Sequence, residues 1–172
     1  RDTGQRGRFF FAIAHLYRNC FIRSSNFKIN SNYKAEDVRM GFELQAVVWT
    51  TVILVTLIGF QGGLVPVNQG LAWGLGNRDE ACEKTALQTR TARTVANHIE
   101  GMSVFVPLAL VVAISDLSST LTVWGAGLYL VGRVLFAPLY LVGVPYLRSL
   151  AWGVSLFGIL LIGFEVVRAA IH

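Results

Sequence analysis

The sequence predicts an all-α fold, an integral membrane four-helix bundle. Hydrophobic residues make up 53% of the 172 residues, only 15% are charged, and the mean hydropathy is +0.53. Soluble domains are about 25% charged, so this composition argues against a soluble globular enzyme. Long apolar runs, the longest of them the charge-free stretch from Leu44 to Asn77, are the candidate spans.

The net charge of +5 belongs to the first 39 residues. They hold eight Lys or Arg and three acidic side chains, whereas residues 40–172 hold seven of each sign. No nucleic-acid partner is therefore predicted. We interpret residues 1–39 as a basic N-terminal extension, disordered or not part of the native protein, and residues 40–172 as a membrane domain starting at Met40. A signal sequence around Phe9 to Tyr17 and an Arg-rich transit peptide are the alternatives.

Four spans follow from length and hydropathy. The apolar stretch from Leu44 to Val67 exceeds the roughly 20 residues that a spanning helix needs. Three further spans are predicted at about residues 88–114, 119–143 and 149–170. A break at Asp116 to Ser119 and a turn around Val144 to Arg148 separate them. Because the links are short, the helices should be antiparallel neighbours.

The basic residues of the links predict the orientation. The link after the first span carries Arg78, Lys84 and Arg90, and the link before the fourth span carries Arg148. Since Lys and Arg concentrate in cytoplasmic loops, both links should face the cytoplasm.

Several charged and polar residues enter the spans. Arg93, Asn97 and Glu100 are spaced i, i+4 and i+7, so they share one stripe of a helix. Arg133 and Tyr140 are also seven residues apart. Arg148 and Trp152 lie at the start of the fourth helix, in the same half of the membrane as the other polar residues. A charge in the lipid interior costs about 2.5–3.5 kcal/mol or more, so these groups should face the bundle.

Two interpretations of these charges stay open. In a structural one, Glu100 pairs with Arg133 and fixes the helix register, while Arg93 reaches the headgroups. In a functional one, three arginines against Glu100 leave two uncompensated positive charges. Such a set matches a ligand with carboxylates and one ammonium.

Cysteine and glycine patterns point to no further chemistry. Cys20 and Cys82 lie far apart without a Cys/His cluster, so neither a disulfide scaffold nor a metal site is predicted. Gly59 and Gly63 form a G-x-x-x-G pattern that indicates helix packing. His98, about 100° from Asn97 around the helix, is interpreted as a packing or rim residue.

Two stretches carry a family resemblance. RTARTVANHIEGMSVF, residues 90–105, contains R-x-x-x-N-x-x-E, and GRVLFAPLYLVGVPYLRSLAW, residues 132–152, contains R-x-x-x-x-x-x-Y followed by Arg. Both resemble the MAPEG superfamily, the membrane-associated proteins in eicosanoid and glutathione metabolism, over roughly residues 42–170. GNRDE, residues 76–80, is similar to a piece of small bacterial members, which implies a bacterial inner membrane.

The resemblance implies a homotrimer with glutathione as co-substrate at each subunit interface. The family's glutathione-binding positions match Arg93, Asn97, Glu100, Arg133, Tyr140 and Arg148 of this chain. In the family, the arginine matching Arg148 stabilises the glutathione thiolate, which makes Arg148 the predicted catalytic residue. The residue types suit the ligand, because arginines clamp carboxylates, Glu100 can take the ammonium, and Asn97 and Tyr140 can bond the amides.

The implied function is a microsomal-type glutathione transferase or peroxidase acting on a lipophilic small molecule that enters from membrane lipid. The alternative is a non-enzymatic ligand-binding or scaffold protein of the same fold. A small transporter or channel component is a third interpretation, which the clustering of the polar residues in one half of the membrane disfavours.

Overall fold

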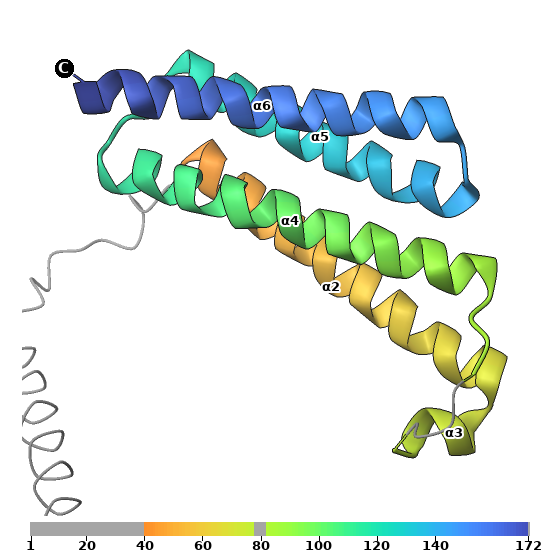
Figure 1. Cartoon of the computed structure of the whole chain (residues 1–172). Helices are drawn as coiled ribbons and strands as arrows, with labels where there is room; N and C mark the ends of the chain where they lie inside the picture. The colour runs from red at the N-terminus through yellow and green to blue at the C-terminus, as the bar shows by residue number, and fades with distance from the viewer. Residues whose placement is uncertain (1–39, 78–81, 172) are drawn as a thin grey trace, which may run out of the picture. The chain divides into compact units, whose positions relative to one another are not determined.

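The computed structural model describes residues 40–77 and 82–171 (Figure 1). The predicted N-terminal extension, residues 1–39, lies outside the described residues, as do residues 78–81 of the first link.

Four long helices make up the described chain: α2 (Phe42–Gln69), α4 (Ala86–Ile114), α5 (Thr120–Val142) and α6 (Pro145–Ile171). Each is long and apolar enough to cross a membrane, with a mean hydropathy of 1.6 to 2.1 in its most apolar window. Large hydrophobic side chains such as Trp49, Val55 and Phe164 are exposed on the outer surface, as expected of helices that face lipid. The predicted four-helix membrane bundle is confirmed.

Local sequence signals fix the helix ends. Thr85 with Gln88, and Ser119 with Thr122, form reciprocal capping boxes that start α4 and α5. α5 ends at Gly143, which adopts a left-handed conformation at φ 90°. These positions agree with the predicted span ends within two residues.

The fourth helix begins at Pro145, four residues earlier than predicted. Proline is well suited to a first helical position, because the N–H that it lacks would have no partner within the helix. Arg148 therefore lies in the first turn of α6 and not in a preceding turn.

A short helix, α3 (Leu71–Leu75), follows α2 and was not predicted. Gly70 breaks the chain between the two helices at φ 87°, and its N–H donates to the Pro66 carbonyl. A side chain at this φ is strained, so glycine suits the position.

The bundle consists of two helix pairs, α2 with α4 and α5 with α6 (Figure 1). Gly132 and Gly158 let α5 and α6 approach closely, because a Cβ on either residue would collide with the facing backbone. Phe105 of α4 and Tyr129 of α5 stack in the core with ring centroids 3.9 Å apart. By contrast, a methyl group added to Gly59 or Gly63 would meet nothing within 4 Å, so their pattern lies on an open face of the single chain.

Candidate functional site

Arg133 is the buried centre of the candidate site. It lies on α5 with only 2% of its surface exposed, and its Nη1 donates to the Asn97 carbonyl at 3.2 Å and to Asn97 Oδ1 at 2.8 Å. Amide oxygens, and not a carboxylate, therefore hold the guanidinium. The pairing of Glu100 with Arg133 that the structural interpretation predicts is not formed, and within the described residues the recorded ion pair joins Glu165 and Arg168.

Gly101 makes room for this arginine. A Cβ on Gly101 would collide with the Arg133 guanidinium, so only glycine at this turn of α4 allows the side chain to lie across the helix. The guanidinium also lies near two rings of its own helix, 5.2 Å from the centroid of Tyr129 and 5.9 Å from that of Phe136.

Arg148 and Tyr140 form a second contact. The Arg148 Cζ atom lies 4.5 Å from the centroid of the Tyr140 ring, and that ring packs at 59° against Phe136 with centroids 5.3 Å apart. A guanidinium on an aromatic face keeps its N–H groups free for other acceptors, because the ring contacts its face and not its edge.

These two arginines open onto neighbouring clefts. The deeper one holds about 200 Å³ between α4, α5 and α6, and the shallower one holds about 290 Å³ near the start of α6. Asn97 and Trp152 line both clefts. Glu100 and Arg133 belong to the first, and Tyr140 and Arg148 belong to the second.

The structure thus brings together five of the six predicted site residues. Arg93 is the exception, because it lines neither cleft. Arg93 and Glu100 are both exposed on α4 of the single chain, so the prediction that these charges face the bundle is wrong for both. The prediction that Asn97 and Glu100 lie on the same side of α4 agrees with the structure, in which both residues line the deeper cleft.

Three buried polar atoms of the inner bundle have no hydrogen-bond partner in the described protein: Arg133 Nε, the Tyr129 hydroxyl and His98 Nδ1. His98 is fully buried, and its Nε2 lies 3.0 Å from the Thr50 carbonyl of α2. Because a carbonyl only accepts, Nε2 is the protonated nitrogen. His98 packs α4 against α2, so of the two predicted roles, packing or rim, the structure agrees with packing.

Sequence reasoning missed several residues of the clefts. Val104, Leu156 and Ile159 give the deeper cleft an apolar wall, and Ser149 lines the shallower one. Aliphatic residues occur throughout a membrane span, so the sequence does not show which of them line a cleft. Gly101 did carry one, because it follows directly on the polar stripe of Asn97 and Glu100.

Comparison with known proteins identifies the family. The sequence profile of the MAPEG family matches residues 46–168, which is more than half of the chain and includes every residue of both clefts. The chain therefore belongs to the MAPEG family, the membrane-associated proteins in eicosanoid and glutathione metabolism, and is an integral, multi-pass membrane protein. No curated protein and no solved structure shows a significant match.

Proposed function

We propose that this MAPEG protein is a glutathione transferase or peroxidase that acts on lipophilic electrophiles. The observation that carries the proposal is the pair of adjoining clefts, whose lining holds two cations, Arg133 and Arg148, and one acidic side chain, Glu100. Two cations against one anion leave a positive charge in a membrane protein, and such a charge favours an anionic ligand.

Glutathione has the groups that this site can bind. Its two carboxylates can accept from the free N–H groups of Arg133 and Arg148, and its ammonium can donate to Glu100. Asn97 Oδ1 is already engaged by Arg133, so its NH2 group is the part left for a peptide carbonyl. The Tyr140 hydroxyl supplies a further donor at the second cleft.

Arg148 is the proposed catalytic residue. In the first turn of α6 its guanidinium lies at the positive end of a 27-residue helix dipole. Both charges favour the thiolate over the thiol, which raises the fraction of reactive sulfur. In a transfer reaction the thiolate sulfur forms the new bond to the electrophilic carbon, and the leaving group departs with the bonding pair.

The second substrate is lipophilic in this proposal. Val104, Leu156 and Ile159 line the deeper cleft beside the polar residues, and Val104 and Leu156 are exposed on the outer surface of the chain. An apolar molecule dissolved in the bilayer can therefore reach the glutathione sulfur without crossing water.

We further propose that the protein assembles as a homotrimer in a bacterial inner membrane. Both clefts are open at the surface of the single chain, and the small residues Gly59 and Gly63 lie on an uncovered face of α2. A neighbouring subunit packed on small residues would complete the walls of such clefts. Analytical ultracentrifugation in detergent tests the trimer.

The test of the function compares Arg148→Ala with Arg148→Lys. Removing a single stabilising donor lowers kcat roughly 100-fold, and we expect this for Arg148→Ala with an aryl halide or a lipid hydroperoxide as electrophile. Arg148→Lys retains a cation and should recover part of the rate. Arg168→Ala, a cation at the other end of α6, is the matched control and should leave turnover unchanged.

The same assay separates the enzyme from a ligand-binding protein of this fold. If the unchanged protein binds glutathione but turns over none of the electrophiles, the site is a binding site without catalysis. If it binds no glutathione, the proposal is wrong.

A further inference from the structure

A third cleft lies apart from the glutathione site, at the junction of α2, α3 and α4. It holds about 180 Å³ and shares no lining residue with the other two clefts. Its apolar lining comes from Val65 near the end of α2, Trp73 of α3 and Ala92 near the start of α4. Nothing in the proposed glutathione chemistry uses it.

A hydrogen-bonded polar wall lines one part of this cleft. Gln69 and Gln88 exchange two hydrogen bonds, at 2.9 and 2.8 Å between their side-chain amides. Gln88 is buried, and it also accepts from the Thr85 N–H and donates to the Leu64 carbonyl. Because these amide groups satisfy one another, the wall does not need a ligand to be stable.

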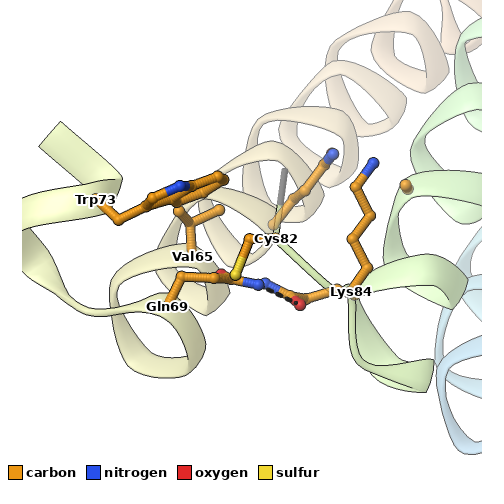
Figure 2. Close-up of a pocket in the computed structure, with 8 residues that line it drawn as sticks. Val65, Gln69, Trp73, Cys82 and Lys84 are labelled. Carbon is orange, nitrogen blue, oxygen red and sulfur yellow. Dashed lines mark hydrogen bonds between the residues drawn. The ribbon is translucent and has the colours of Figure 1, made fainter. Parts of the chain in front are cut away.

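Lys84 supplies a charge that the described protein does not neutralise. Figure 2 shows its side chain on one side of the cleft and the Trp73 ring on the other, with Cys82 between them. No hydrogen bond or ion pair of Lys84 occurs among the residues that the structure describes. The neighbouring cation Arg90 is engaged instead, because its Nη1 donates to the Leu141 and Val142 carbonyls at the end of α5.

The place of the cleft in the fold matches a membrane surface. It lies where one spanning helix ends and the next begins, so its apolar wall continues the lipid-facing part of α2 and α4 while Lys84 lies in the link between them. The basic residues of this link indicate the cytoplasmic side, where anionic lipids are enriched.

We propose that this cleft binds the headgroup of an anionic phospholipid. Lys84 pairs with the phosphate, and Val65, Trp73 and Ala92 contact the glycerol and the first acyl carbons. A zwitterionic headgroup brings its own cation next to Lys84, whereas an anionic one does not, so the site prefers phosphatidylglycerol to phosphatidylcholine.

Cys82 provides a reporter for this site, because it is exposed and lines the cleft. The full chain carrying Tyr146→Cys is placed in phosphatidylcholine vesicles with or without phosphatidylglycerol and is alkylated with N-ethylmaleimide. Tyr146 is 87% exposed in the first turn of α6, at the same end of the bundle, so the introduced thiol reports the general effect of the anionic surface. Peptide mass spectrometry gives the rate at Cys82 relative to that thiol.

We expect phosphatidylglycerol to lower this relative rate at least threefold, and Lys84→Gln to remove the effect. Arg90→Gln, which deletes a cation of the same link whose charge is already engaged, should keep the effect. Thermal unfolding of each variant verifies that it is folded.

Three results would overturn the proposal: the same relative rate in both lipids, an unchanged effect in Lys84→Gln, or an equal loss in Arg90→Gln. Slowing by inorganic phosphate in pure phosphatidylcholine would assign the cleft to a small anion and not to a lipid. Glutathione binding is measured separately, so neither outcome depends on the proposed enzyme.

Discussion

At the end of the bundle where α2 begins, a buried carboxylate accepts two hydrogen bonds, whereas around Arg133, deeper in the bundle, buried polar atoms lack partners. Glu43 is 2% exposed and accepts from the Ser118 hydroxyl at 2.9 Å and from the Thr122 hydroxyl. Deeper in the bundle, Arg133 and the adjacent Tyr129 each bury a polar atom without a hydrogen-bond partner in the described protein.

This difference separates a structural use of polar residues from a functional one. Each bond to Glu43 joins α2 to the segment around the start of α5, and none of the three clefts includes Glu43. The Arg133 half has two clefts and an excess of positive charge. Unpartnered buried polar groups are uncommon in proteins, and where they occur they often mark a functional site. Substitutions in each half can test whether stability and ligand binding divide in this way.

The largest expected effect on stability is at the paired end. Glu43→Ala leaves the Ser118 hydroxyl without its acceptor and the Thr122 hydroxyl with only the Ser119 carbonyl, and it breaks both bonds between α2 and the start of α5. We expect a loss of about 3 kcal/mol in the free energy of unfolding. Thermal unfolding in detergent measures this loss. Glutathione affinity of the folded protein should stay unchanged, and a loss of affinity with no loss of stability would reverse the assignment of the two ends.

A smaller effect is expected at Gly101. Gly101→Ala places a methyl group where the Arg133 guanidinium lies and displaces that side chain without changing any charge. We expect a roughly tenfold weaker glutathione Kd, which corresponds to about 1.4 kcal/mol. Gly163→Ala on α6, whose Cβ would make only an ordinary contact at 3.9 Å, is the matched control. Equal affinities of the two variants would show that Arg133 does not need its observed position.

The smallest effects come from a matched pair of hydroxyl deletions. Thr122→Val removes a hydroxyl that donates to Glu43 and should destabilise the protein by about 1 kcal/mol. Tyr129→Phe removes an unpartnered hydroxyl and keeps the stack on Phe105, so the free energy of unfolding should change by less than about 0.5 kcal/mol. Equal losses from both deletions would mean that the Tyr129 hydroxyl is as well paired as that of Thr122.

The sequence predicted the helices well because length and hydropathy determine them. The four spans agree within a few residues, and α6 differs most, since the proline that was interpreted as a turn residue is its first residue. α3 was missed because Leu71 to Leu75 is too short for any periodic signal.

Five of the predicted site residues line the two clefts, but the contacts among them were not predicted. Spacing along α4 placed Asn97 and Glu100 together, yet it did not decide which of them bonds Arg133, because that depends on the rotation of α4 against α5. The exposure of Arg93 and the burial of Glu43 are likewise set by helix packing. The sequence around Arg93 and around Glu43 does not distinguish a charged residue buried inside the bundle from one at a helix surface.

The proposed division of the bundle into a glutathione-binding part around Arg133 and a structural end around Glu43 can be measured directly. Glutathione is titrated by calorimetry into three detergent-solubilised proteins: the unchanged chain, Arg133→Gln and Glu43→Gln. We expect binding in the unchanged chain, the same Kd for Glu43→Gln, and a roughly 100-fold weaker Kd for Arg133→Gln, as expected when a charge-assisted contact to a carboxylate is lost. Equal affinities for all three proteins, or no binding by the unchanged chain, would contradict this division.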